Sequence, residues 1–319
     1  MTASAQIEIA GRPVGPGHPC FVIAEAGVNH NGELPLALAL CEAAKEAGAD
    51  AVKFQTFEAA RLVSGRTPLA DYQQQTVGHY PSQLEMLRAL ELDEAAHRAL
   101  IERCGQLEIR FLSSPFDEGS CDRLEALGVP AFKLGSGELT NRRLLAHVAG
   151  KGKPLILSTG MATEEEIAAA LALLENHGAR EVALLRCVSS YPAPPAEANL
   201  RAIQSLAQRF GRPVGFSDHT QGIEVSLAAV AVGACIVEKH LTLDRALPGP
   251  DHRASSAPDE MARLVRGIRL VESALGDGAI GPSASERSNR VAARRSLVVA
   301  RAVERGEALE PSMLTALRP

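Results

Sequence analysis

Short apolar runs alternate along the chain with longer segments in which apolar residues recur every three or four positions. The short runs are typical of buried parallel strands, and the longer segments are typical of helices that cover a sheet. The predicted strands span residues 20–26, 51–55, 109–113, 131–135, 154–158, 181–187, 213–216 and 235–238. The predicted helices span residues 36–47, 83–104 with a break near 92–93, 118–127, 141–148, 164–176, 200–209, 223–232 and 259–275.

Eight strand–helix units in a row predict an α/β fold of the (β/α)8 TIM-barrel type, whose chemistry lies at the carboxyl ends of the strands. A doubly wound open sheet is the alternative, but no Gly-x-Gly-x-x-Gly motif follows the first strand. End signals support the helices: Asp93 and Thr163 are predicted N-caps, and Gly48, Gly128 and Gly178 are predicted helix ends.

Two segments depart from the repeat. Residues 58–83 predict a long polar loop, and a loop of this length in a compact domain is usually functional or mobile. Residues 281–293 are typical of a linker, and residues 294–319 are too few for an independent core. The predicted organisation is a barrel over 1–280, a linker over 281–293 and a short C-terminal segment over 294–319.

Composition and charge narrow the class of protein. Hydrophobic residues make up 46% of the 319 residues, enough for a large core, and the formal net charge is −5. This charge gives no general attraction to nucleic acid or to an anionic membrane. The first 17 residues do not form a secretory signal, and the longest apolar run, 226–237, is too short to span a bilayer. With six cysteines that lack Cys-x-x-Cys spacing, these features predict a cytoplasmic protein with free thiols.

Two histidines lie at the ends of neighbouring predicted strands. His219 follows the run 213–216, His240 follows the run 235–238, and a segment of helix length separates them. A strand–helix–strand unit places the two strands parallel, so their ends meet at one edge of the sheet. The two imidazoles are therefore predicted to share one metal ion. Two unrelated core histidines are the alternative, and the repeated placement favours the metal site.

Three of the six lysines lie at predicted strand ends. Alternation along a strand predicts that Lys53, in phase with Gln55, points into the barrel mouth together with Lys133. Lys239 is adjacent to His240 and is predicted to point toward the helices in a structural role. Two ammonium groups in one mouth repel each other unless an anion lies between them, which predicts a small polyanionic ligand. A salt-bridged lysine at the rim is the alternative for either residue.

Further polar groups follow other strand ends. Hydroxyls in glycine- or serine-containing loops, at Ser136, Ser158 and Ser217, form a predicted cradle for phosphate oxygens. Glu25 ends the first strand, where a nearby metal and two lysines would keep it ionised as a base or proton relay. A buried ion pair with a lysine is its alternative role. His30 is predicted to make a loop hydrogen bond rather than to bind metal.

Taken together, these motifs resemble the signature segments of the sialic acid synthase family. The resemblance runs in order from residue 20 to about residue 275. It is carried by residues 23–32 (IAEAGVNHNG), 52–56 (VKFQT), 132–141 (FKLGSGELTN), 157–161 (LSTGM), 216–220 (FSDHT), 238–240 (EKH) and 249–252 (GPDH). Members of this family condense phosphoenolpyruvate with an open-chain N-acyl mannosamine-type sugar, giving a nine-carbon 3-deoxy-2-keto acid and phosphate.

The resemblance implies a role for each matching residue. Glu25, Lys53 and Lys133 would be catalytic, with Glu25 handling the proton of the water that adds at C2. Phosphoenolpyruvate would be held by Lys53, Lys133, Ser136, Ser158 and Ser217. The sugar would be held by Gln55, Glu138, Ser189, Tyr191, Asp251 and Arg318. A divalent metal, Mn²⁺ in the first place and Mg²⁺ or Co²⁺ as alternatives, would be held by His219 and His240.

Two departures from the family pattern leave the acceptor sugar open. Ser189 stands where bacterial N-acetylneuraminate synthases often carry asparagine, and legionaminate and pseudaminate synthases vary at this position. Residues 294–319 resemble only the beginning of the C-terminal antifreeze-like (SAF) domain, with Arg318 matching the arginine of its Arg-Pro motif. In the family this domain reaches over the partner subunit, so we expect a homodimer with a weakened sugar site.

Other functions compete with this interpretation. A synthase that forms a 3-deoxy-2-keto sugar acid phosphate would need further basic residues for a second phosphate. A metal-dependent hydrolase would need a His-x-His motif on the first strand, where Ala24, Glu25 and Ala26 stand. A non-catalytic barrel that binds a sugar acid would have no use for Glu25 beside both histidines.

Overall fold

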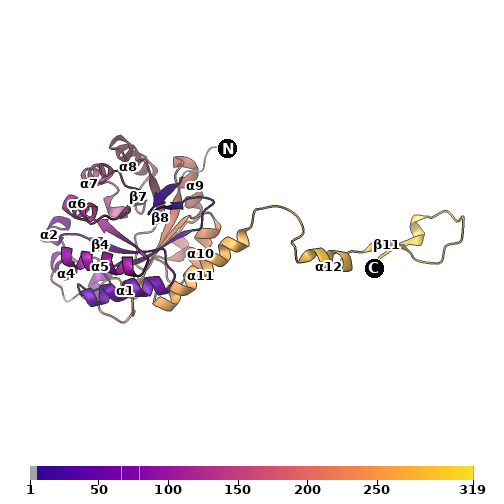
Figure 1. The fold of residues 1–319 in the computed structure, drawn as a ribbon, viewed down its shortest axis with the longest axis horizontal. Coiled ribbons are helices and arrows are strands. Elements are labelled where there is room, and N and C mark those ends of the chain that lie inside the picture. The colour runs from indigo at the N-terminus through magenta and orange to yellow at the C-terminus, as the bar shows by residue number, and fades with distance from the viewer. Residues whose placement is uncertain (1–5, 66, 79, 319) are drawn as a thin grey trace. The chain divides into compact units, whose positions relative to one another are not determined.

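The computed structural model describes residues 6–65, 67–78 and 80–318, and it contains a parallel sheet that nearly closes into a barrel (Figure 1). The strands are β3 (Phe21–Gly27), β4 (Ala51–Thr56), β5 (Arg110–Pro115), β6 (Phe132–Leu134), β7 (Leu155–Ser158), β8 (Val182–Cys187), β9 (Val214–Asp218) and β10 (Ile236–His240). They pair in the order β5-β4-β3-β10-β9-β8-β7-β6, and β5 also contacts β6. The predicted (β/α)8 barrel is therefore confirmed, with each strand end within two residues of the prediction.

Helices surround the sheet, one after most of the strands (Figure 1). They are α1 (Leu34–Glu46), α5 (Glu94–Gln106), α6 (Glu118–Ala126), α7 (Arg142–Ala149), α8 (Glu164–Asn176), α9 (Arg201–Phe210), α10 (Glu224–Ala231) and α11 (Pro258–Leu275). The Asp93 and Thr163 side chains accept hydrogen bonds from Ala96 N and Glu166 N, as predicted for N-caps. The predicted helix ends Gly48, Gly128 and Gly178 all have positive φ, which glycine adopts without steric cost.

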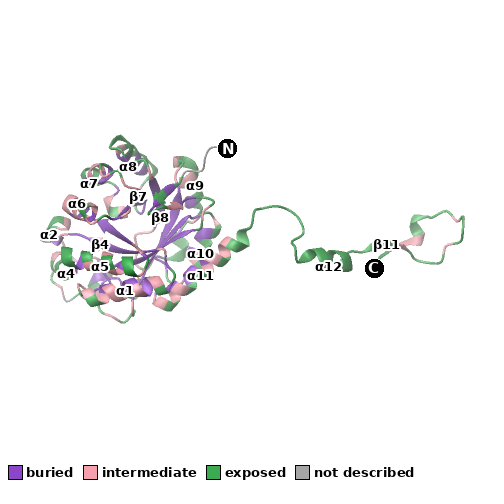
Figure 2. Ribbon diagram, viewed as in Figure 1, coloured by how far each residue is buried: buried purple, intermediate pink, exposed green. Residues whose placement is uncertain are grey.

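The barrel strands are buried on both faces (Figure 2). Alternate residues face either the surrounding helices or the barrel interior, and each set forms its own hydrophobic cluster. The interior cluster includes Ile7, Ile9 and Val14 from the hairpin of β1 (Ile7–Ile9) and β2 (Arg12–Val14). This hairpin, which the sequence analysis did not predict, packs against residues at the amino ends of the strands, such as Phe21 and Ala51. It closes the end of the barrel that carries no chemistry.

Residues 58–83 do not form the single polar loop that was predicted. This segment contains the short helices α2 (Ala59–Leu62) and α3 (Asp71–Val77) and is followed by α4 (Gln83–Ala89). The prediction was wrong because a small satellite cluster of buried residues stabilises local structure here, made of Val28, Phe57, Val77, Met86 and Leu90. The break predicted within 83–104 is confirmed, since α4 and α5 are separate helices.

The chain divides into two compact units, Met1–Ala274 and Leu275–Pro319. The second unit contains α12 (Glu286–Ala293) and an antiparallel pair formed by β11 (Ser296–Val299) and β12 (Leu314–Leu317). Eight residues of the predicted linker are thus helical. None of the residues of these three elements is buried, which agrees with a segment too small for its own core.

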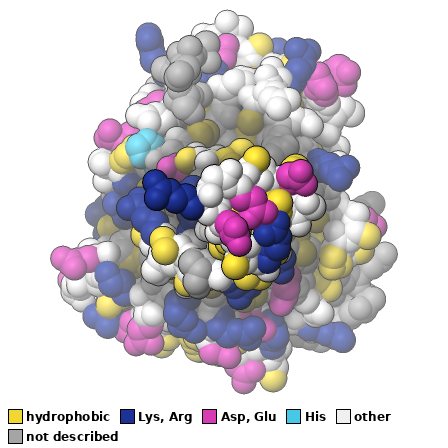
Figure 3. Space-filling model, turned by 90° about the vertical axis from the view of Figure 1, so that its right-hand side faces the viewer, with side chains coloured by type: hydrophobic (Ala, Val, Ile, Leu, Met, Phe, Trp, Pro, Cys, Tyr) yellow, Lys and Arg dark blue, Asp and Glu magenta, His cyan; other side chains and the backbone are white. Residues whose placement is uncertain are grey.

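The surface carries charges of both signs. Basic and acidic side chains both occur across the face shown in Figure 3, in keeping with the small net charge of −5. None of the helices in the described part of the chain combines the length and apolar character that a membrane crossing requires.

A candidate active site at the carboxyl ends of the strands

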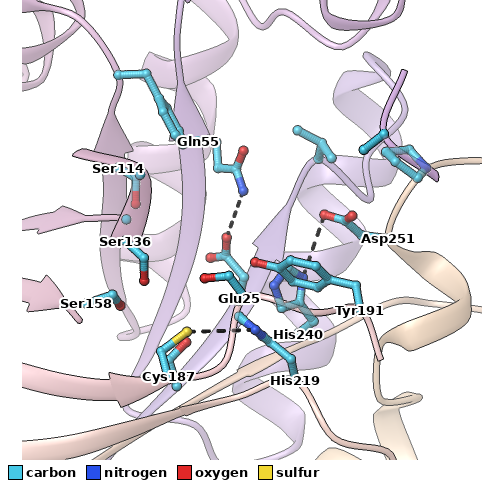
Figure 4. Close-up of a pocket in the computed structure, with 18 of the residues that line it drawn as sticks. Glu25, Gln55, Ser114, Ser136, Ser158, Cys187, Tyr191, His219, His240 and Asp251 are labelled. Carbon is cyan, nitrogen blue, oxygen red and sulfur yellow. Dashed lines mark hydrogen bonds and ion pairs between the residues drawn. The ribbon is translucent and has the colours of Figure 1, made fainter. Parts of the chain in front are cut away.

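A cavity of about 610 Å³ lies at the carboxyl ends of the barrel strands (Figure 4). All the predicted site residues except Glu138 and Arg318 line it. The register explains how side chains from separate strands meet, because Glu25 of β3 is the backbone partner of both His240 of β10 and Lys53 of β4. The structure therefore brings the predicted histidines, lysines and carboxylate together.

The two predicted lysines share a carboxylate that the sequence analysis missed. Lys53 Nζ lies 2.7 Å from Glu25 Oε2 and 3.7 Å from Glu238 Oε2, and Lys133 Nζ lies 3.4 Å from Glu238 Oε1. All four side chains are buried. Glu238 and His240 lie two residues apart on β10, so strand alternation places them on one face, and this signal was sufficient to predict Glu238. The anion expected between the lysines is supplied in part by the protein itself.

Burial and charge set different protonation tendencies for these carboxylates. Burial alone would raise the pKa of Glu238, but the ammonium groups of Lys133 and Lys53 and a hydrogen bond from Ser217 lower it to about 2. Burial raises the pKa of Glu25, and the neighbouring Glu238 charge adds to this effect although Lys53 opposes it. Glu238 thus remains a fixed anion, whereas Glu25 is the carboxylate better suited to exchange a proton.

The lysines also differ from each other. Burial would lower the pKa of Lys53, but the carboxylates of Glu238 and Glu25 outweigh burial and raise it. Burial lowers the pKa of Lys133, and the charge of Lys53 works in the same direction. Lys133 therefore gains the most from an additional anion in the cavity.

Hydroxyl groups line the wall beside the lysines. Ser217 Oγ donates to Glu238 Oε1 at 2.8 Å, and Ser136 Oγ accepts from Gly160 N at 2.9 Å. Ser158 Oγ is buried and has no hydrogen-bond partner in the described part of the chain. Ser114, which the sequence analysis did not select, accepts from Lys53 Nζ at 3.2 Å. The unpartnered Ser158 hydroxyl is the group that a bound ligand would satisfy, since buried polar groups are rarely left unpaired.

The two histidines face one another at the cavity wall (Figure 4). Their ring centroids lie 5.4 Å apart. His219 Nδ1 donates to Val188 O at 2.6 Å, which leaves the lone pair of its other nitrogen available. His240 Nδ1 lies 3.8 Å from Asp251 Oδ2 and has no hydrogen-bond partner among the described residues. Burial and the His219 charge lower the pKa of His240, which favours the neutral imidazole that binds metal.

The histidine pair fits a divalent ion with open coordination positions. Tyr191 packs on the pair, with its ring centroid 4.2 Å from that of His219 and 5.8 Å from that of His240. Cys187, another lining residue missed from the sequence, has its Sγ 3.8 Å from His219 Nδ1. No group of three or more metal-binding side chains occurs within residues 6–65, 67–78 and 80–318, so protein ligands to an ion here would be the two imidazoles.

Other predictions have mixed outcomes. Lys239 points away from the cavity and forms a buried ion pair with Asp218, as its structural role required. His30 accepts a loop hydrogen bond from Gly32 N at 3.0 Å, as predicted.

Glu138 does not line the cavity; its carboxylate accepts from Asn141 Nδ2 at 2.7 Å. Arg318 is exposed in the second unit.

The fold and the cavity define a (β/α)8-barrel enzyme whose candidate active site combines a buried lysine pair with a histidine pair. The NeuB family matches residues 40–280 of the chain. The chain is 47% identical over 312 residues to the N,N'-diacetyllegionaminic acid synthase of Legionella pneumophila, covering 97% of this chain and 88% of the relative. It is 48% identical over 301 residues to the enzyme of the same name in Campylobacter jejuni, covering 94% and 90%. The chain belongs to the sialic acid synthase (NeuB) family, and the assignment made from its motifs is confirmed.

A solved structure supports the same conclusion. The N-acetylneuraminic acid synthetase of Leptospira borgpetersenii, crystallised with citrate, is similar with a TM-score of 0.79 and 36% identity. The likeness covers 90% of this chain and 95% of that one. The barrel is thus that of a sialic acid synthase.

Proposed function

We propose that this chain condenses phosphoenolpyruvate with an unphosphorylated N-acyl mannosamine-type sugar, giving a nine-carbon 3-deoxy-2-keto acid of the sialic acid type and phosphate. The observation that carries the proposal is the meeting of Lys53, Lys133 and Glu25 with a histidine pair in one cavity. Family membership supports the same class of enzyme, a transferase of carbohydrate biosynthesis.

Phosphoenolpyruvate would be held by the lysine pair and the hydroxyl wall. Its phosphate and carboxylate need several cationic and hydrogen-bonding groups, which Lys53, Lys133, Ser136, Ser158 and Ser217 provide along one side of the cavity. Two of these groups have unused capacity: among the described residues, Ser158 Oγ has no hydrogen-bond partner and Lys133 forms one ion pair, with Glu238. Binding of the anion would therefore give Lys133 a second anionic neighbour and give Ser158 Oγ a hydrogen-bond partner.

A divalent ion, in the first place Mn²⁺, would be held by His219 and His240, with Mg²⁺ and Co²⁺ as alternatives. When bound, such an ion supplies Lewis-acid polarisation of the sugar aldehyde. The protein's contribution is to orient both imidazoles, His219 through Val188 O and His240 through burial beside Asp251.

The remaining steps fall to the cavity's own residues. The C3 carbon of phosphoenolpyruvate forms a bond to the aldehyde carbon, whose oxygen takes up a proton and becomes a hydroxyl. Water then adds at C2 and gives a proton to Glu25, which is held by Lys53 Nζ at 2.7 Å and by Gln55 Nε2 at 3.2 Å. The bond from C2 to the phosphate oxygen then breaks, and phosphate leaves with the electron pair and takes up the proton of the C2 hydroxyl, so that C2 becomes a ketone. The proton that water gives to Glu25 balances the one that the aldehyde oxygen gains.

Part of the cavity lining is apolar and suits an acceptor that carries methyl groups. It includes Val28, Met86, Leu87, Leu90 and Phe116. Lys53 and Lys133 are the only cationic side chains apart from histidine in the described lining, and both are used for phosphoenolpyruvate. A second phosphate would have no cationic partner, which argues against the alternative synthase of a sugar acid phosphate.

We therefore take the preferred acceptor to be 2,4-diacetamido-2,4,6-trideoxymannose, which leads to a legionaminate-type product. Its C6 methyl group and second acetamido methyl group suit the apolar lining, where a hydroxymethyl group would lose hydrogen bonds to water. The names of the relatives from Legionella and Campylobacter support this choice.

The proposal extends to assembly and location. In a homodimer, residues 294–319, as the beginning of an antifreeze-like (SAF) domain, would bring Arg318 toward the partner's sugar. Glu138 would join the sugar site by turning away from its present hydrogen bond with Asn141.

The six cysteines are all free and buried, which supports a location in the reducing cytoplasm.

The test is phosphate release from phosphoenolpyruvate, measured separately with N-acetylmannosamine and with the trideoxy diacetamido sugar. We expect release that depends on the sugar, is faster with the trideoxy sugar, is abolished by EDTA and is restored by Mn²⁺. Release with neither sugar, from protein shown to bind phosphoenolpyruvate, would refute the proposed reaction. Faster release with N-acetylmannosamine would refute the acceptor assignment alone.

A further inference from the structure

A buried ion pair lies directly behind the two histidines, on the side of the strands that faces the helices. Lys239 Nζ lies 2.9 Å from Asp218 Oδ2, and the two side chains are 2% and 0% exposed. Asp218 and Lys239 are register partners on β9 and β10. His219 directly follows β9 and His240 is the last residue of β10, so each member of the Asp218–Lys239 pair precedes one histidine.

The pair also fixes the backbone around His219. Asp218 Oδ1 accepts from Thr220 N at 2.8 Å, and Lys239 Nζ donates to Thr220 O at 2.8 Å. Asp218 Oδ2 accepts a further hydrogen bond from Ser226 Oγ of α10. Both backbone polar groups of Thr220 are therefore held by the Asp218–Lys239 pair, which ties the segment that carries His219 to β10.

We infer that Asp218 and Lys239 are positioning residues that set the separation of His219 and His240, and thereby the affinity of the histidine pair for its divalent ion. This inference rests on the metal site of the proposed function. A site with only two protein ligands has few bonds with which to correct a misplaced imidazole, so its affinity depends on how well the rings are placed beforehand. A purely stabilising ion pair would have no such effect.

The two roles are separated by three variants of the full-length chain: Asp218→Asn, Lys239→Met and the double variant. Each single variant leaves one buried charge unpaired and is expected to lower the melting temperature, whereas the double variant removes both charges and should regain stability. Mn²⁺ affinity is measured from the electron paramagnetic resonance signal of free Mn²⁺, and phosphoenolpyruvate affinity by calorimetry. Arg269→Met, which removes ion pairs with Asp50 and Glu272, is a control for lost stability.

The inference predicts that all three Asp218 and Lys239 variants weaken Mn²⁺ binding by about 10- to 100-fold, the usual effect of losing a group that orients a ligand. The double variant should stay weak although its melting temperature recovers, and Arg269→Met should bind Mn²⁺ normally. Mn²⁺ affinity that recovers with stability in the double variant, or that never falls, would overturn the inference.

Histidine variants distinguish this failure from failure of the metal site itself. If His219→Asn and His240→Asn abolish Mn²⁺ binding while the Asp218 and Lys239 variants keep the wild-type affinity, only the positioning role is wrong. If the histidine variants bind Mn²⁺ as the wild type does, the proposed metal site is wrong and the inference is overturned with it.

Discussion

Lys133 Nζ lies 3.4 Å from Glu238 Oε1 inside the barrel, so the cavity that is proposed to bind an anion already contains one. The same carboxylate lies 3.7 Å from Lys53 Nζ. Because both lysines are buried, Glu238 compensates two charges that could not otherwise remain in a site of low polarity. The free protein thus holds both lysine side chains in place before the substrate arrives.

Replacing this carboxylate should expose its role in stability. We expect Glu238→Gln to lower the free energy of unfolding by about 3–5 kcal/mol, because a buried charge loses its partner. Phosphoenolpyruvate should raise the melting temperature of this variant more than that of the wild type, since the ligand replaces the lost anion.

Urea denaturation and thermal melts with and without ligand measure both effects. The control is Glu125→Gln, which breaks a contact with Lys151 at a side chain that is 40% exposed and should cost about 0–1 kcal/mol. Equal stability losses in the two variants would contradict the role assigned to Glu238.

Glu25 should matter for turnover more than for binding. Glu25→Gln keeps the shape of the side chain but cannot take the proton of the attacking water, so we expect kcat to fall by about 10²- to 10⁴-fold. Calorimetry should still detect phosphoenolpyruvate binding to this variant. Undiminished kcat would remove Glu25 from the mechanism.

Ser158 offers a test of the phosphate cradle that leaves the fold unchanged. Its hydroxyl has no protein partner in the described part of the chain, so Ser158→Ala should leave the melting temperature unchanged. Loss of a hydrogen bond to a charged phosphate should raise the Kd for phosphoenolpyruvate by about 10- to 100-fold.

Ser217→Ala is the matched comparison for Ser158→Ala, because Ser217 Oγ donates to Glu238 and its loss should lower stability as well. An unchanged Kd in Ser158→Ala would place the phosphate elsewhere in the cavity.

The buried His30 predicts how stability depends on pH. Burial lowers the pKa of His30 from 6.5 to about 4, with the His97 charge acting in the same direction. Between these values the unfolded chain binds more protons than the folded chain, so stability is fully present above pH 6.5 and is lost as the pH falls toward 4.

His30→Gln should reduce the loss in the free energy of unfolding between pH 6.5 and pH 4 by about 3 kcal/mol, as measured by urea denaturation across this range. His18→Gln, at a partly exposed position in the loop after β2, is the control for the loss of a histidine side chain. A wild-type slope in His30→Gln would show that other groups cause the acid sensitivity.

Strand alternation explains why much of the site was predictable. Buried parallel strands form continuous apolar runs, so polar residues that interrupt them, such as Glu25, Lys53 and Lys133, are conspicuous. The same alternation correctly separated Lys239 from His240. Glu238 shares the strand phase of His240, and this phase, rather than the motif that contains both residues, is the signal for its place in the cavity.

Other features of the fold and the site could not be predicted from a local sequence pattern. Glu138 belongs to the single turn Ser136–Glu138 after β6, where neither strand nor helix periodicity tells which way a side chain points. The hairpin of Ile7–Val14 is defined by its burial against the barrel's amino end, which is a tertiary contact. The helices within residues 58–83 likewise depend on packing against Phe57 and Met86.

The most direct test of the central claim follows the carbon of phosphoenolpyruvate that forms the new bond. Phosphoenolpyruvate labelled with ¹³C at C3 is incubated with the trideoxy diacetamido sugar, Mn²⁺ and the protein, and the products are observed by NMR. The proposed function predicts that the label appears in the methylene group at C3 of a nine-carbon keto acid. Label in the methyl group of pyruvate, or label that stays in phosphoenolpyruvate, would contradict it.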